Sequence, residues 1–164
     1  MTAPVSPKSP TEAAEEFAAA LPPRGGLLGL DLGTKTIGIA TSDPDRRIAS
    51  PVTTLKRGKF SANLVELKAL IAERATAGLV LGLPINMDGT SGPRAQSSRT
   101  FARNLARELD VPILLWDERL STAAMERELI SLDTSRRRRA EVIDEMAANF
   151  ILQGALDRLQ ALAS

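Results

Sequence analysis

The chain has 164 residues, a formal net charge of +1, 43% hydrophobic residues and 25% charged residues, which together are typical of one ordinary globular domain. It contains neither cysteine nor histidine, which excludes disulfides, thiolate or imidazole metal ligands and every nucleophilic triad with a histidine base. Any metal must therefore be held by oxygen, which favours Mg²⁺ or Mn²⁺ over Zn²⁺.

The first 24 residues differ in composition from the rest. They form a polar segment interrupted by five prolines: Pro4, Pro7, Pro10, Pro22 and Pro23. A short helix is predicted between the third and fourth proline, with Thr11 as its cap and with Phe17 and Leu21 available for docking. An isolated helix of this length is marginal in water. We therefore expect a disordered or weakly helical arm over residues 1–24 and a folded domain over 25–164.

Strands and helices alternate along that domain. Apolar runs and alternating patterns predict strands at 26–31, 36–42, 49–55, 78–83 and 111–116. Helical periodicity predicts helices at 61–77 (capped by Ser61), 95–109, 120–132 and 139–162. Two hairpin-linked strands followed by strand–helix alternation predict an α/β fold with a mixed central β-sheet and helices packed on it.

The loop over residues 84–92 carries typical turn residues. Pro84 stiffens the exit from the preceding strand, and Asn86, Asp88 and Gly89 suit a tight turn. Two interpretations stay open: a purely structural turn, or a loop that borders a substrate channel.

No apolar run in the sequence is long enough to cross a bilayer. The amino terminus also lacks the charged start and apolar stretch of a secretory signal. We therefore expect no membrane partner and a cytoplasmic location.

Acidic residues follow two of the predicted core strands. Asp31 ends the first strand, and a buried carboxylate there is costly unless a cation or several donors compensate it. Asp117 and Glu118 directly follow the last strand. In open α/β sheets, ligand sites gather at the carboxyl ends of the strands. Neighbouring strand residues point to opposite faces, so only one of Asp117 and Glu118 can aim at such a site.

A further acid, Asp144, lies within the last predicted helix. Ala147 and Ala148 follow it at helical spacing, and such small residues let a helix approach a sheet closely. Together with the strand-end acids, Asp144 would complete a set of three carboxylates, which is a good oxygen cage for hard cations. Two such cations about 3.5–4 Å apart can activate a water and stabilise the leaving oxygen in phosphodiester cleavage.

Structural roles for these acids stay open on the residues alone. Asp31 can be a turn former, and Asp144 can be an ordinary exposed helix residue. The segment after the last strand can simply end it, with Ser121 capping the next helix.

Four adjacent arginines, Arg136, Arg137, Arg138 and Arg139, lie just before the last helix or in its first turn. Cations are unfavourable there because the helix dipole is positive at its amino end. The run is either solvated or in contact with a phosphate backbone, and its closeness to Asp144 favours nucleic acid. One tryptophan and no tyrosine argue against base stacking as a major mode of recognition.

Four segments, in this order, resemble the YqgF family, also called RuvX: 29–40, 82–90, 117–122, and Asp144 with the following Ala147-Ala148 and Ile151-Leu152-Gln153. The similarity runs from about residue 26 to 161. It implies a ribonuclease H-like fold and a divalent-metal-dependent bacterial nuclease that acts on structured nucleic acid. Members are described as pre-16S rRNA nucleases, acting at the 5′ end of that precursor, or as Holliday-junction-resolvase-like proteins.

The resemblance also implies site residues. The catalytic and metal-binding acids would be Asp31, Glu118 and Asp144, with Asp117 as the alternate for Glu118. The expected cations are Mg²⁺ or Mn²⁺. The expected partners are pre-16S rRNA or branched DNA, and a homodimer is possible because junction resolvases act as dimers. We expect the nucleic acid to be contacted by Lys35, Arg119, Arg136, Arg137, Arg138 and Arg139.

Three other functions remain open. Cleavage of branched DNA is the nearest alternative. A non-catalytic nucleic-acid-binding module is the second. The third is an ATPase, because the Asp31-Leu32-Gly33-Thr34 turn also resembles the phosphate loop of actin-like and Hsp70-like proteins, although those need two lobes to close over a nucleotide.

Overall fold

The computed structural model describes residues 9–120 and 136–164, with the side chains of the last helix described from Met146 onwards. The strands are β1 (Leu27–Leu32), β2 (Thr36–Ser42), β3 (Ala49–Lys56), β4 (Gly78–Leu83) and β5 (Ile113–Asp117). The helices are α1 (Ala14–Ala20), α2 (Phe60–Glu73), α3 (Pro93–Glu108), the 3₁₀ turn η1 (Glu118–Leu120) and α5 (Arg136–Ala163). Within the described ranges, no helix is long and apolar enough to cross a membrane.

The five strands form one mixed sheet in the order β3-β2-β1-β4-β5. Strand β2 pairs antiparallel with both β1 and β3, whereas β4 is parallel to β1 and β5 is parallel to β4. The first three strands are joined as a meander, and the parallel strands follow helices. This is the ribonuclease H-like arrangement, so the expected fold class is confirmed.

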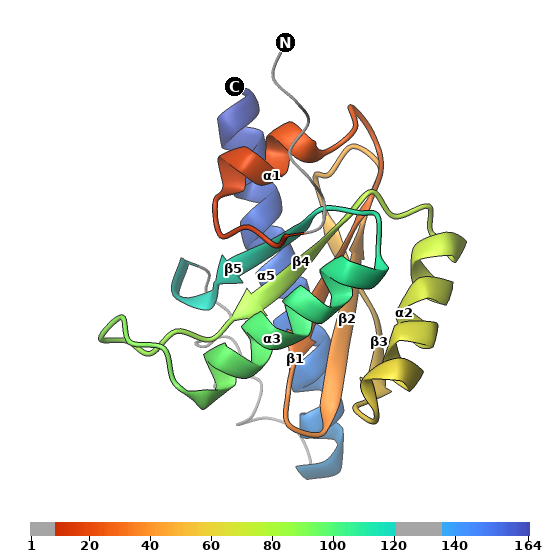
Figure 1. Cartoon of the computed structure of the whole chain (residues 1–164), viewed down its shortest axis with the longest axis vertical. Helices are drawn as coiled ribbons and strands as arrows, with labels where there is room; N and C mark the ends of the chain where they lie inside the picture. The colour runs from red at the N-terminus through yellow and green to blue at the C-terminus, as the bar shows by residue number, and fades with distance from the viewer. Residues whose placement is uncertain (1–8, 121–135) are drawn as a thin grey trace.

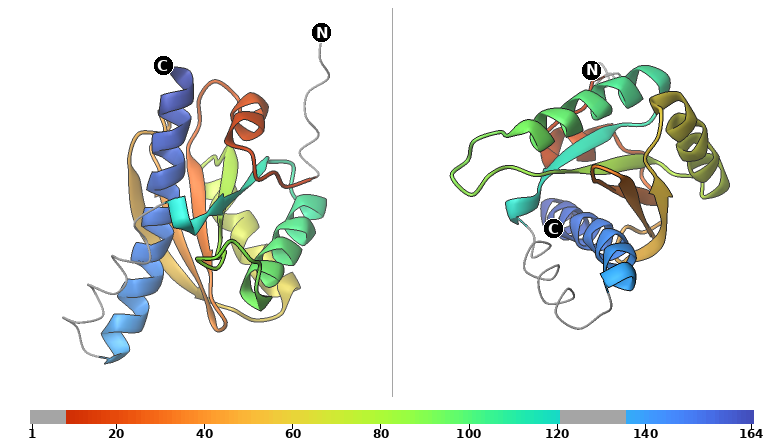
Figure 2. Two further views of the ribbon diagram at one scale, coloured as in Figure 1. Left: turned by 90° about the vertical axis from the view of Figure 1, so that its left-hand side faces the viewer. Right: turned by 90° about the horizontal axis from the view of Figure 1, so that it is seen from below.

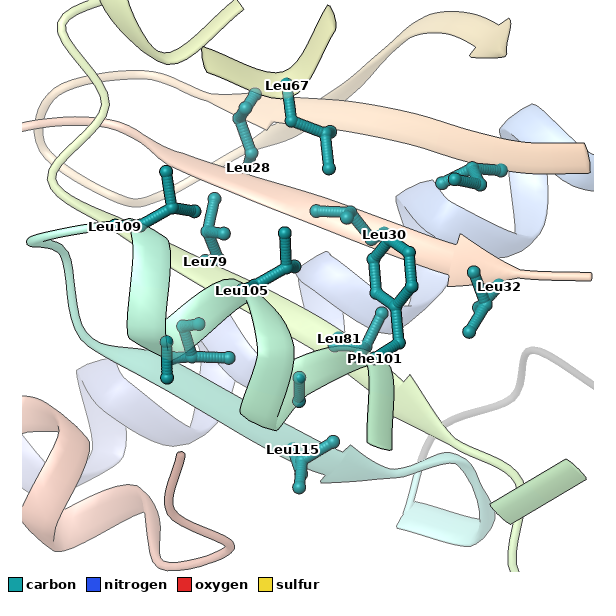
Figure 3. Packing of buried hydrophobic residues seen from close by; sticks show 14 of the residues in the cluster. Leu28, Leu30, Leu32, Leu67, Leu79, Leu81, Phe101, Leu105, Leu109 and Leu115 are labelled. Atoms are coloured by element: carbon teal, nitrogen blue, oxygen red, sulfur yellow. The ribbon is translucent and has the colours of Figure 1, made fainter. Parts of the chain in front are cut away.

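Helices cover both faces of this sheet. Helix α5 lies along one face, and α2 and α3 lie on the other (Figure 1, Figure 2). Side chains of β1 alternate between the two faces: Leu28, Leu30 and Leu32 join the core under α2 and α3 (Figure 3), whereas Leu27 joins the core under α5. Strand alternation therefore turns Asp31 towards the α5 face.

Within the N-terminal arm, the structure describes residues 9–24, which include the short helix α1. Helix α1 packs against the core under α5 through Phe17, which is fully buried. Thr11 does not cap this helix; it forms a parallel bridge with Leu114 of the edge strand β5. Propensity alone makes so short a helix marginal, and tertiary burial supplies the missing stability.

Helix α2 begins and ends earlier than its sequence predicts. Its N-cap is Lys59, which makes no side-chain cap bond, so the expected cap by Ser61 is wrong. Asn63 instead accepts a hydrogen bond from the amide of Gly58 at 3.0 Å and stabilises the entry to the helix. The helix stops at Glu73 because Ala75 adopts a positive φ of 49°.

The last helix begins at Arg136, three residues before the predicted start, so the arginine run lies in its first turn. The helix predicted over 120–132 falls almost wholly outside the described residues. Only Leu120 is described, and it ends the 3₁₀ turn η1.

Candidate active site at the carboxyl ends of the central strands

Asp31 is a buried carboxylate inside the central strand β1. It is only 5% exposed and pairs with Gly38 across the hairpin. On the other side, β1 and β4 pair in register at Leu30 and Leu81. Continuing that register by one residue brings Asp31 beside Gly82.

The carboxylate of Glu118, in the turn η1 that follows β5, also lies next to Gly82. Its Oε2 lies 3.3 Å from the point that a Cβ on Gly82 would occupy. Gly82 pairs with Trp116, two residues before Glu118. Because glycine has no side chain, Gly82 leaves room on the α5 face for this carboxylate. Asp31 and Glu118 are therefore brought to one edge of the sheet, on the same face.

Asp117 takes no part in this approach. Its Oδ2 accepts a hydrogen bond from Nη2 of Arg119 at 2.8 Å, and its Oδ1 accepts one from the backbone amide of Arg119 at 2.9 Å. The side-chain hydrogen bond from Arg119 holds the pKa of Asp117 below its ordinary value, although partial burial opposes this. The two adjacent acids thus diverge at the end of β5, as strand alternation predicts.

The backbone of α5 brings Asp144 towards the same strand ends. The carbonyl oxygen of Ala148 lies 3.0 Å from the point that a Cβ on Gly29 would occupy, which confirms the expected close approach of this helix to the sheet. Further along, Gln160 donates a hydrogen bond to the carbonyl of Arg46, near the beginning of β1. Helix α5 is therefore antiparallel to β1, and Asp144 lies one turn beyond Ala148 in the direction of Asp31. The side chain of Asp144 lies outside the described residues.

The turn after Asp31 is stabilised by hydrogen bonds from Arg57, which lies beyond the end of β3. The amide of Gly33 donates to the carbonyl of Thr36 at 2.8 Å and closes the β1–β2 turn. Nη1 of Arg57 donates to the carbonyl of Gly33 at 2.7 Å, and its Nη2 donates to Ser97 on α3 at 3.1 Å. Lys35 is exposed on this turn. Sequence reasoning missed Arg57 because no local motif marks a residue that acts across the fold.

The loop between β4 and α3 is a tight turn, as its residues predict. The amide of Gly89 donates to the carbonyl of Asn86 at 2.8 Å, and Gly89 has a φ of 89° that favours glycine. The hydroxyl of Thr90 donates to Asp88 and lowers the pKa of that carboxyl. Nη1 of Arg119 lies 3.7 Å from the Cβ position of Gly89, so this loop borders the candidate site.

The donors gathered at this edge fit a hard divalent cation. Asp31 and Glu118 supply carboxylate oxygens, which are the ligands that a hard divalent cation prefers. Within the residues whose side chains are described, no cluster of three acidic, histidine or cysteine residues occurs. The third expected acid, Asp144, and the arginine run at 136–139 have side chains outside that part of the structure.

Comparison with known proteins identifies the family of this chain. The RuvX family model, described as Holliday junction resolvase, matches residues 25–158. The chain belongs to the RuvX family. This confirms the family that the sequence motifs resemble, and the matched region contains all four motifs.

Relatives of this RuvX protein share most of its length. A protein from a Bradyrhizobium species, named "Putative pre-16S rRNA nuclease", is 67% identical over 147 residues, covering 90% of this chain and 91% of the relative. A protein of the same name from Nitrobacter winogradskyi is 68% identical over 144 residues, covering 88% of each chain. Among solved structures, Thermus thermophilus RuvC is 12% identical with a TM-score of 0.49, covering 82% of this chain and 96% of RuvC.

Proposed function

We propose that this RuvX protein is a divalent-metal-dependent nuclease that hydrolyses phosphodiester bonds at the 5′ end of pre-16S rRNA during ribosome biogenesis. The observation that supports it most is that Oε2 of Glu118 lies 3.3 Å from the Cβ position of Gly82, the residue that the continued β1–β4 register sets beside Asp31. The nuclease class agrees with the names of relatives that are 67% identical to this chain. A cytoplasmic location belongs to the same proposal, because it follows from an rRNA precursor as substrate.

The carboxylates of Asp31, Glu118 and Asp144 would hold Mg²⁺ or Mn²⁺. When bound, such cations supply an activated water and stabilise the leaving oxygen of a phosphodiester. The protein contributes rigidity: β1 is paired with β2 and β4, and Asp31 itself is paired with Gly38 of β2. The 3₁₀ turn closed by the Asp117–Arg119 pair turns Glu118 to the α5 face.

The substrate is the finer part of the proposal. The names of the relatives favour an RNA precursor, whereas the description of the family model favours a branched DNA junction. Exposed Lys35 and the arginines at 136–139 are the proposed contacts for either polymer, together with Arg119 beside the loop over 84–92. A homodimer belongs to the branched-DNA alternative, because resolving a junction requires two cuts.

A cleavage assay on both polymers tests the proposal. Purified protein is incubated with Mg²⁺ or Mn²⁺ and either an RNA that spans the 5′ end of 16S rRNA or a four-way DNA junction, and the product ends are mapped. Cleavage of the RNA at discrete positions is expected, and Asp31→Asn should lower its rate by at least about a hundredfold while RNA binding persists. Asp110→Asn, at an exposed position at the opposite end of β5, is the control.

Undiminished cleavage by Asp31→Asn would show that this carboxylate holds no essential cation. Cleavage of the junction with no cleavage of the RNA would replace the substrate by branched DNA. Binding of either polymer without any cleavage would leave only the nucleic-acid-binding module.

A further inference from the structure

Three arginines form a row along one side of α3. Arg99, Arg103 and Arg107 are spaced four residues apart, so they lie on one helix face with a rise of about 6 Å between neighbours. The side chains of Arg103 and Arg107 are exposed, and that of Arg99 is half-buried. The row borders a cavity of about 440 Å³ whose other walls are Leu115 of β5 and Ser9, Pro10 and Glu12.

One end of the arginine row contacts the loop over 84–92, which borders the candidate active site. Nη1 of Arg99 donates a hydrogen bond to Ser91 of this loop at 2.7 Å. Gly89 of the same loop lies beside Arg119. From there the row follows α3 along β5, which is the edge strand of the sheet. Substrate bound at the strand ends can therefore continue along the row without crossing the core.

The row already contacts an anionic group of its own chain. Nε of Arg99 lies 3.4 Å from a carboxylate oxygen of Glu12, in the segment that bridges to β5. The Glu12 side chain is 56% exposed, so this ion pair is weak and readily exchanged. Guanidinium groups bind phosphate as they bind carboxylate, often through two parallel hydrogen bonds.

We propose that the arginine row on α3 binds the sugar–phosphate backbone of the nucleic-acid strand that extends from the cleaved bond. This rests on the proposed nuclease function and adds a second contact surface to it. The row lies on the α2/α3 face of the molecule, apart from the arginine run at the start of α5. Each exposed arginine contacts phosphate rather than a base, so the row contributes affinity without sequence preference.

The salt dependence of RNA binding tests this surface directly. Fluorescence anisotropy measures the affinity for a labelled single-stranded RNA in EDTA at salt concentrations between roughly 50 and 200 mM. Over this range, the release of counterions from the RNA makes the affinity fall measurably with salt. Each lost phosphate contact should reduce the slope of log K against log salt by about 0.7. Arg103→Gln with Arg107→Gln should therefore reduce it by about 1.4 and weaken binding about tenfold near 0.1 M salt.

Matched variants separate this surface from general charge. Arg103→Lys with Arg107→Lys should restore most of the slope, because lysine still neutralises phosphate. Arg74→Gln, which removes an exposed arginine just after α2, should leave the slope unchanged. Glu12→Gln should tighten binding more than the control Glu73→Gln on α2, because Glu12 is paired with Arg99 of the row and competes with phosphate for it.

If the double glutamine variant keeps the slope of the parent protein, the arginine row does not bind the backbone. If the parent protein also cleaves RNA, the proposed nuclease function is unaffected by that result. Equal weakening by Arg74→Gln would also overturn it, since the effect would then be one of net charge. A parent protein that neither binds nor cleaves RNA or the DNA junction would overturn both proposals.

Discussion

The Oε2 atom of Glu118 lies 3.3 Å from the point that a Cβ on Gly82 would occupy. A carboxylate from the end of β5 thus lies over the neighbouring strand, next to the position of Asp31 on β1. This contact depends on Gly82 having no side chain. It also distinguishes Glu118 from Asp117, which is bonded to Arg119 instead.

Gly82→Ala is expected to lower both stability and cleavage. The added methyl would lie 2.6 Å from Cδ1 of Ile151, so the core under α5 has to shift, and it would push against the Glu118 carboxylate. Overpacking of this kind costs about 1–3 kcal/mol. Urea denaturation and the RNA cleavage rate measure the two effects. Gly58→Ala is the control, because nothing lies within 4 Å of its Cβ position; equal activity of both variants would contradict the assignment of Glu118.

Glu118→Gln and Asp117→Asn should have unequal effects on cleavage. Loss of the Glu118 carboxylate removes a proposed metal ligand and should slow cleavage by more than about a hundredfold, which exceeds the usual loss for a residue that only orients a metal ligand. Asp117→Asn retains an oxygen that accepts the Arg119 amide and should cost about tenfold or less. Single-turnover rates at saturating Mn²⁺ compare the two variants. The opposite order would assign the metal to Asp117.

Phe17→Ala is expected to destabilise the whole domain. Phe17 is fully buried in the core under α5, and its ring lies 3.1 Å from the Cβ position of Gly78 on β4. Removing such a ring from a core costs about 3–5 kcal/mol. Chemical denaturation measures the change, with Val65→Ala at a 68% exposed position of α2 as the control. A free energy of unfolding as high as that of the control would mean that α1 does not dock in solution.

Much of the sheet could be predicted from local patterns. The runs over 78–83 and 111–116 are apolar throughout because β4 and β5 are buried on both faces, and such runs are recognisable without tertiary information. The ends of the helices are predicted less accurately than the strands. The side chain of Asn63 and the positive φ of Ala75 decide where α2 begins and ends. Neither residue occupies the N-cap or C-cap position, where capping signals are normally read from a sequence.

The burial of one candidate site residue could be predicted from the sequence, whereas the contacts around it could not. Asp31 is recognisable in the sequence as a charged residue in an apolar strand, and its predicted burial is confirmed. The hydrogen bond from Arg57 to the carbonyl of Gly33 cannot be predicted from a local sequence pattern, because the two residues are 24 positions apart. The sequence also allows Phe17 to dock without requiring it, because helix propensity says nothing about the core that receives the ring.

The sequence by itself determined the strand order along the chain, the family, and a chemistry limited to oxygen ligands, because these depend on residue identity and short-range pattern. The tertiary structure decided which of two adjacent acids faces the α5 side, and it brought Glu118 over Gly82 beside Asp31. That outcome depends on the parallel pairing of β1, β4 and β5, which are far apart along the chain: β2, β3 and α2 separate β1 from β4, and α3 separates β4 from β5. Register between such distant segments is set by packing, which no local pattern encodes.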